Sequence, residues 1–98
     1  MADFWGTPWT RTLSWGMKGK DVQCVHINLW TLFRDNWGDK YPVPSEKESL
    51  FSLGTKKAVE HFQRRLDLPV TGKVDKDTWD YINWCLECYD AYYMSQAT

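Results

Sequence analysis

Cysteine and histidine side chains are the first residues of this chain to consider for chemistry, because both are common zinc ligands. Cys85 and Cys88 have the Cys-x-x-Cys spacing, and Cys24, His26 and His61 could supply further ligands. A structural zinc site needs four clustered ligands and commonly two such pairs, whereas this chain has one pair inside a predicted helix. Packed thiols are the simpler interpretation. We therefore expect no metal site and no cofactor.

Carboxylates are the second group to consider, because glycan hydrolysis needs two of them across a cleft, one with a raised pKa. The glutamates available for this role all have polar neighbours, where an ordinary solvated carboxylate is expected: Glu46, Glu48, Glu60 and Glu87. No Ser-His-Asp, Cys-His or His-Glu-x-x-His arrangement is present. The sequence thus predicts no catalytic residue, and we expect that the chain is not an enzyme.

Aromatic side chains are the remaining candidates for a functional surface. The 98 residues include seven Trp and five Tyr, more than one small core requires. Trp37 and Tyr41 lie in the stretch 35–49, which Gly38 and Pro42 help to mark as a loop. Helical core packing therefore explains them least. They either contact a ligand or cover the core beneath the loop.

Three stretches of the chain show apolar residues at steps of three and four, the period of an amphipathic helix. Ser52 precedes Thr55 by three residues, and Asp75 precedes Thr78 by the same interval, as an N-cap residue does at the start of a helix. The predicted helices cover about residues 20–34, 52–66 and 75–93.

The second and third helices and the turn between them carry a recognisable series of residues: Phe51, Thr55, Ala58, Val59, Phe62, Gln63, Leu68, Pro69, Gly72, Val74, Thr78 and Trp79. This series resembles the three-helix peptidoglycan-binding domain of cell-wall hydrolases and phage endolysins. A weaker upstream element of the same family is matched by Gly19, Val22, Val25, His26 and Leu29. The resemblance covers roughly residues 13–82, and the stretch 35–49 departs from it as an apparent insertion.

The resemblance implies an all-α fold, a compact three-helix bundle. Residues 1–12 have no helical or strand period and are expected to form an extended aromatic arm folded against a lengthened last helix. The domain itself is predicted to span residues 13–93, and residues 94–98 are predicted to form a flexible C-terminal end.

The function implied by the resemblance is non-catalytic binding of bacterial peptidoglycan, through its glycan and its stem peptide. Such a domain would target a lysin or a virion component to the cell wall. The groove is expected between the end of the first helix, the loop 35–49 and the Gln63 side of the second helix. The candidate ligand-binding residues are His26, Trp30, Trp37, Tyr41, Gln63 and Arg64.

Several of these candidates have a structural alternative. His26 and Gln63 adjoin core positions, so they either tie loop backbone to a helix or hydrogen-bond the ligand. Arg64 and Arg65 form a solvated face, or one of them grips a stem-peptide carboxylate through the two-bond fork of its guanidinium.

The aromatic ends of the chain offer an alternative function, in which the fold docks a protein partner. That partner would be a hydrolase subunit or a second copy of the chain. The candidate partner-binding residues are Trp5, Trp9, Tyr92 and Tyr93. Packing of the arm against the last helix is the structural alternative.

Composition sets the remaining limits. Net charge is −1, so the basic surface of a nucleic-acid binder is not expected. No apolar run approaches the roughly 20 residues that span a bilayer, so we expect no membrane partner. The N-terminal residues lack the charged start and apolar block of a secretory signal. We therefore expect synthesis in the cytoplasm without a signal peptide and action at the bacterial cell wall, as suits a phage product.

Overall fold

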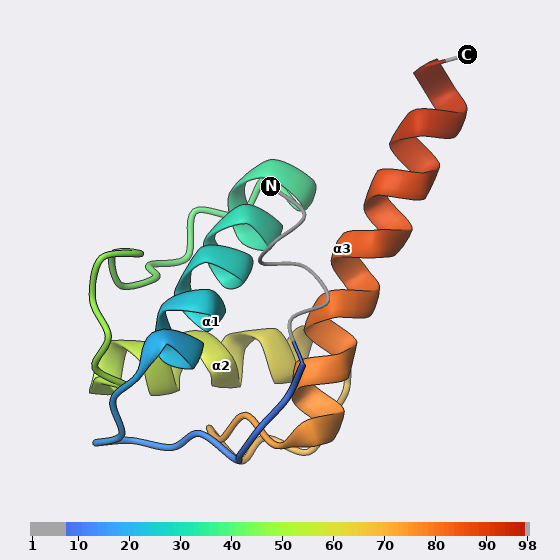
Figure 1. The fold of residues 1–98 in the computed structure, drawn as a ribbon. Coiled ribbons are helices and arrows are strands. Elements are labelled where there is room, and N and C mark those ends of the chain that lie inside the picture. Colours follow the sequence, from blue (N-terminus) through green and yellow to red (C-terminus); the bar gives the residue numbers. More distant parts are fainter. Residues whose placement is uncertain (1–7, 98) are drawn as a thin grey trace.

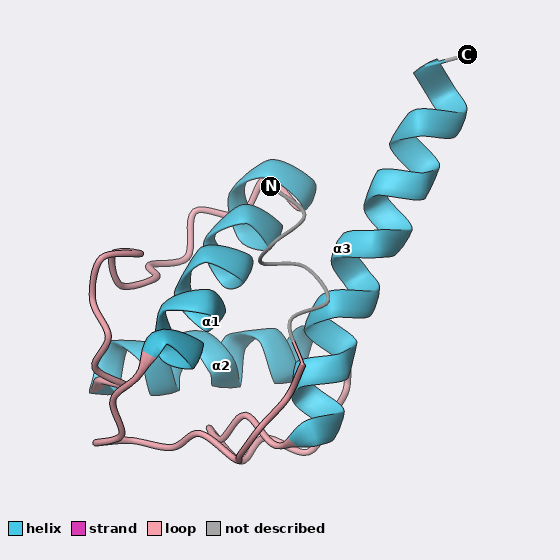
Figure 2. Ribbon diagram, in the orientation of Figure 1, coloured by secondary structure: helices cyan, strands magenta, loops and turns pink. Residues whose placement is uncertain are grey.

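The computed structural model describes the backbone of residues 8–97 and the side chains of residues 8–87 (Figure 1). These residues form three α-helices, and a π-helical turn, η1, prolongs the first. The elements are α1 (Lys20–Thr31), η1 (Leu32–Asn36), α2 (Leu53–Arg65) and α3 (Lys76–Ala97). Between residues 8 and 97 no strand forms, as Figure 2 shows, and the predicted all-α three-helix fold is confirmed. None of the described helices is both long and apolar enough to cross a membrane.

Two helix ends differ from the prediction. The first helix was expected to stop near residue 34, but its last turn widens into η1 and ends at Asn36. The third helix continues past the expected residue 93 to Ala97, because its last residues include neither Gly nor Pro to interrupt it. In Figure 1 this end of α3 extends beyond the other helices.

The predicted starts of α2 and α3 are confirmed. Ser52 Oγ accepts a hydrogen bond from the Thr55 backbone N–H at 3.3 Å, and Thr55 Oγ1 accepts one from the Ser52 N–H at 3.1 Å. This reciprocal pair is a capping box, which satisfies backbone donors that the first turn leaves unpaired. Asp75 Oδ1 likewise accepts from the Thr78 N–H at 2.9 Å. Both helices therefore begin where local chemistry places them.

The core is built from the apolar stripes of all the helices and from the segments between them. Three of its side chains lie outside the helices, namely Leu13, Phe51 and Val74, and each is fully buried. The other buried apolar side chains include Val22, Val25, Leu29, Leu32, Phe33, Ala58, Val59, Phe62, Trp79, Ile82 and Leu86.

The segment 13–19 connects the loops that precede α2 and α3. Leu13 and Val74 exchange two backbone hydrogen bonds, at 3.0 and 2.9 Å. Farther along, the Phe51 N–H donates to the Met17 carbonyl, and the Gly19 N–H donates to the Ser49 carbonyl. Figure 1 shows this blue segment passing along the bottom of the domain toward α1. These contacts hold the starts of the helices in register.

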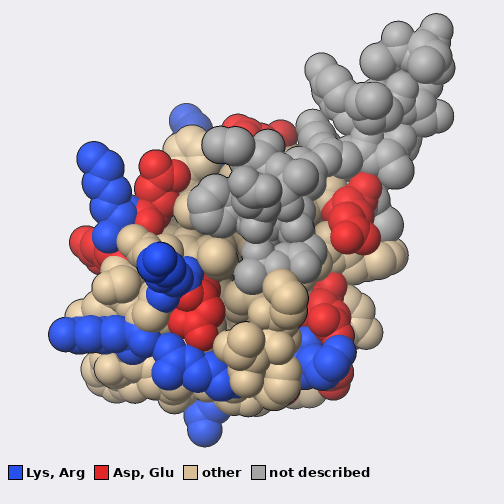
Figure 3. Space-filling view, in the orientation of Figure 1, with Lys and Arg blue, Asp and Glu red and all other residues tan. Residues whose placement is uncertain are grey.

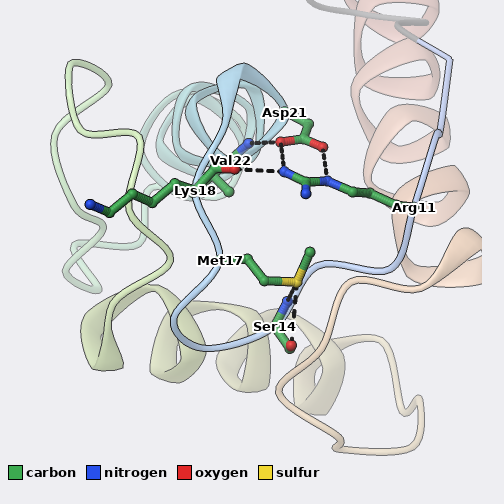
Figure 4. Close-up of polar contacts among 6 residues, drawn as sticks. All are labelled: Arg11, Ser14, Met17, Lys18, Asp21 and Val22. Carbon is green, nitrogen blue, oxygen red and sulfur yellow. Dashed lines mark hydrogen bonds and ion pairs between the residues drawn. The ribbon is translucent and has the colours of Figure 1, made fainter.

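Arg11 joins the end of the N-terminal arm to the start of α1 (Figure 4). Its Nε donates to Asp21 Oδ2 at 2.9 Å, and its Nη2 donates to the Lys18 carbonyl at 2.6 Å. The bond from Arg11 is the main cause that lowers the pKa of Asp21. At Gly19 a Cβ atom would lie 2.5 Å from Asp21 Oδ1 and 2.7 Å from Arg11 Nη2, so a larger residue would have to displace this ion pair.

Candidate functional site

Trp37 packs over the core at the point where η1 leads into the long loop. Its ring stacks on Phe33, with centroids 5.5 Å apart, and on Phe62, with centroids 6.0 Å apart and an interplanar angle of 9°. The guanidinium carbon of Arg65 lies 4.4 Å from the Trp37 ring centroid. Trp37 therefore covers the core, and its remaining contact is with a cation.

Tyr41 lies against α2 rather than in solvent. Its ring stacks on the His61 ring at 4.0 Å with an interplanar angle of 8°, and it meets Phe33 edge-on at 6.2 Å. The Tyr41 carbonyl accepts a hydrogen bond from Arg34 Nη1 at 3.2 Å. These contacts fix the middle of the loop on the surface of the helix.

Asp39 is the polar centre of this loop. Its Oδ2 accepts a hydrogen bond from His61 Nε2 at 2.6 Å and lies 3.6 Å from Arg65 Nη1, while its Oδ1 accepts from the Tyr41 N–H at 3.0 Å. The bond from His61 is the main cause that lowers the pKa of Asp39. The carboxylate is therefore ionised at neutral pH and orients both His61 and Arg65.

A shallow groove of about 290 Å³ runs between this loop and the start of α2. The loop side is formed by Tyr41 and by the apolar run 42–44, and the helix side by Gly54 and Lys57. Lys57, His61 and Arg65 are four residues apart along α2, so they lie on one face of the helix, next to the loop. We call this surface the loop groove.

A second hollow lies where η1 leads into the loop. It has a volume of about 370 Å³ and is lined by Arg34, Gly38, Asp39 and Lys40. Arg34 also lies over the ring of Trp30, 5.1 Å from its centroid, and this Trp side chain is 45% exposed. Arg34 and Lys40 thus bring positive charge to this hollow as well.

Comparison with known proteins bears on what this surface is for. Residues 36–82 match a family model described as a putative peptidoglycan binding domain. These residues form a peptidoglycan-binding domain of that family. The match starts at the end of η1 and covers the loop, α2 and the first part of α3. No curated protein matches the chain.

The resemblance inferred from the sequence is thereby confirmed, and peptidoglycan binding is the general function that it assigns. The loop groove lies within the matched residues, because the loop residues and the face of α2 that form it fall between residues 41 and 65.

His26 precedes the matched residues, is fully buried and has a structural role. Its Nδ1–H points at the carbonyls of Ser45 and Glu48, at 3.2 and 3.0 Å, and its Nε2 accepts from the Thr55 hydroxyl at 2.8 Å. Burial lowers the pKa of His26, so the neutral form is favoured. The side chain ties the end of the loop to both α1 and α2, as in the structural alternative.

Gln63 is also buried, with 1% of its surface exposed. Its Oε1 accepts the backbone N–H groups of Thr71 and Gly72, at 3.0 and 3.1 Å. Its Nε2 lies within hydrogen-bond distance of the Lys73 carbonyl and of two hydroxyls, those of Thr71 and Thr78. Gln63 therefore organises the turn between α2 and α3, and it does not line the loop groove.

Of the two neighbouring arginines, the structure places Arg65 beside the loop. Arg64 lies on the next face of α2, where its Nη2 is 4.0 Å from Glu60 Oε1 and 60% of its side chain is exposed. Arg64 was the predicted ligand contact, whereas Lys57 and His61, which were not predicted, lie beside the loop. The signal that could have found this set is the four-residue spacing of Lys57, His61 and Arg65.

The aromatic ends are only partly described. Trp9 is half-buried, packs against the core and lines a hollow together with α3. Trp5 and the side chains of Tyr92 and Tyr93 lie outside the described residues, so their predicted partner contacts remain predictions. Figure 3 shows Lys and Arg close to Asp and Glu over the face that it presents.

Proposed function

We propose that this chain is a non-catalytic module that binds the stem peptide of peptidoglycan in the loop groove and so targets a lysin or a virion component of a phage to the cell wall. The observation that carries the proposal is the position of two cations on one face of α2: Lys57 lines the hollow, and Arg65 lies about two turns farther along, beside Trp37. Stem peptides carry free carboxylates, which such cations bind.

Arg65 is well prepared to bind a carboxylate. Its guanidinium is placed by the Trp37 ring at 4.4 Å and by Asp39 at 3.6 Å, so little side-chain freedom remains to be lost on binding. A guanidinium presents parallel N–H donors that match the two oxygens of a carboxylate, whereas a lysine offers a compact charge. Arg65 therefore orients a bound carboxylate. Lys57, which lies nearer to Pro42 and Pro44, adds electrostatic attraction for the peptide.

The wall of the groove suits an extended peptide. Pro42 and Pro44 have no backbone N–H, so this part of the loop presents an apolar edge. Tyr41 is held in place by its stacking on His61. A peptide backbone can pack along this edge while its carboxylates face α2.

A non-catalytic role is supported by the positions of the glutamates. Glu46, Glu48 and Glu87 are exposed, and Glu60 lies 3.4 Å from Lys56 Nζ. A glycosidase acid needs a desolvated carboxyl group in a cleft, with a raised pKa. The protein should accordingly release no dye from labelled cell walls, and dye release above that of a heat-inactivated sample would contradict the non-catalytic assignment.

Binding to purified sacculi tests the proposed site. We expect Arg65→Ala to weaken binding by about tenfold or more, because hydrogen bonds to charged groups contribute about 1.5–3 kcal/mol. Arg64→Ala is the matched control, since it removes an arginine of the same helix that lies outside the groove. Arg65→Lys separates charge from geometry, because lysine keeps the positive charge but lacks the two parallel N–H donors of a guanidinium.

The control also decides between the two arginines. Equal loss in Arg64→Ala and Arg65→Ala would show that only net charge matters and would overturn the loop groove as the site. Full binding by Arg65→Ala with a folded spectrum would overturn it as well. Binding of the wild type should fall as salt is raised, because exposed charge pairs are screened.

A further inference from the structure

The outer face of α3 carries two hollows that share Asp80 and Trp84. The first has a volume of about 510 Å³ and is also lined by Trp9, Trp79, Asn83 and Glu87. The second has a volume of about 380 Å³ and is also lined by Asp77 and Tyr81. We call this surface the α3 groove. It lies away from the loop groove and uses none of its residues.

Two aromatic rings project from this surface. Trp84 is 58% exposed and Tyr81 is 42% exposed, and they are three residues apart on a helix whose opposite side is buried through Ile82 and Leu86. Trp84 borders both hollows, so its ring forms a ridge between them. Because the helix backbone is rigid, the rings need no rearrangement before binding.

Carboxylates surround these rings. Asp77, Asp80 and Glu87 line the hollows and are exposed. Lys76 also lines the first hollow, but its Nζ lies 2.7 Å from Asp80 Oδ2, so its charge is largely neutralised within the surface. The groove is thus rich in hydrogen-bond acceptors and has a negative balance of charge, the opposite of the loop groove.

We infer that the α3 groove binds an uncharged saccharide, the glycan part of peptidoglycan. Indole and phenol rings offer flat apolar faces with polar edges, which can cover the C–H face of a pyranose ring. Carboxylates accept hydrogen bonds and donate none, so they pair with the hydroxyl donors of a sugar. The same negative charges repel the carboxylates of a stem peptide, which the cations of the loop groove attract.

This inference rests on the proposed function and divides it between two surfaces. The loop groove contacts the peptide, and the α3 groove contacts the sugar chain from which the peptide branches. Two weak contacts on one polymer reinforce each other, because the second forms at high effective concentration.

The test is a titration of the full chain with tetra-N-acetylchitotetraose, a neutral oligosaccharide without peptide, followed by two-dimensional NMR. We expect resonance changes at Tyr81 and Trp84, and we expect Trp84→Ala to weaken binding at least tenfold. Trp15→Ala is the matched control, because Trp15 is 61% exposed and does not line the α3 groove. Both substitutions remove an exposed ring, so both variants should keep the unfolding midpoint of the wild type.

Three outcomes overturn the inference. They are resonance changes that avoid α3, equal loss in the two tryptophan variants, and a dimer that Trp84→Ala dissociates while the saccharide causes no change. A synthetic stem peptide without sugar tests the loop groove separately, with Arg65→Ala as its variant. Peptide binding without saccharide binding overturns the α3 groove alone, and saccharide binding without peptide binding overturns the loop groove alone.

Discussion

Replacing Gln63 with alanine should destabilise the domain far more than replacing the arginine beside it. Gln63 makes contacts with the turn that leads into α3, and two of these contacts, to the Gly72 N–H and the Thr78 hydroxyl, are buried. The other three, to two groups of Thr71 and to the Lys73 carbonyl, are part-buried. Alanine leaves the N–H groups of Thr71 and Gly72 and the Thr78 hydroxyl without this partner, whereas the Thr71 hydroxyl and the Lys73 carbonyl still bond to each other.

The size of the effect follows from how well water can replace the amide. Each buried group left unpaired costs about 1.5 kcal/mol, and each part-buried group, which water reaches, costs about 0.5 kcal/mol. With two buried groups and one part-buried group left unpaired, the free energy of unfolding should fall by about 3.5 kcal/mol, a large part of the roughly 5–15 kcal/mol of a natural domain. A change of this size lowers the melting temperature by about 15–30 °C in a chain of this length.

Urea unfolding followed by circular dichroism measures this loss. Arg64→Ala is the control, because an exposed side chain with one weak ion pair should change stability by less than about 0.5 kcal/mol. Gln63→Glu adds a second check, since the carboxylate keeps the two backbone donors as partners but repels the Lys73 carbonyl. Burial raises the pKa of that carboxyl, so this variant should recover stability as pH falls and the group gains a proton.

A loss below about 1 kcal/mol in Gln63→Ala, similar to that of Arg64→Ala, would refute the reasoning. Such a result would mean that water replaces the hydrogen bonds of Gln63 in the turn between α2 and α3, or that other contacts keep the turn in place. A loss in Gln63→Glu that is independent of pH would refute the assignment of the amide as a donor to Lys73.

The remaining predictions concern His26, two glycines and a helix cap. Burial lowers the pKa of His26, so the unfolded chain takes up the proton first; stability should be complete above pH of about 6.5 and decline below it. His26→Gln, which can both donate and accept, should flatten this decline in urea titrations at pH 5 and 7.5. Gly72→Ala should lower the midpoint of thermal unfolding more than Gly38→Ala does. The angle φ is positive at both glycines, but of the two only Gly72 has a neighbour that a Cβ would meet, Lys56 Cγ at 2.9 Å. Ser52→Ala should lower stability by about 1 kcal/mol in the same assay, and an unchanged midpoint would contradict the capping role.

The starts of α2 and α3 and their inward faces could be predicted from the sequence. Ser52 bonds to Thr55 and Asp75 bonds to Thr78, so each cap acts over three residues and is visible in a short stretch of chain. The apolar period is also visible in a short stretch of chain, and it indicates which side of a helix faces the core. Fold and family follow from such local signals.

The composition of the candidate site depended on contacts between distant parts of the chain. Asp39 and His61 are 22 residues apart, as are His26 and Glu48, and these bonds decide which face of α2 the loop covers. They place Arg65 beside Asp39 and turn His26 inward. The sequence by itself determined the helices, their caps and the family, because those depend on interactions within one or two turns. Only the tertiary structure decided which charged and aromatic side chains meet, because the path of the loop is set by hydrogen bonds that join separate elements.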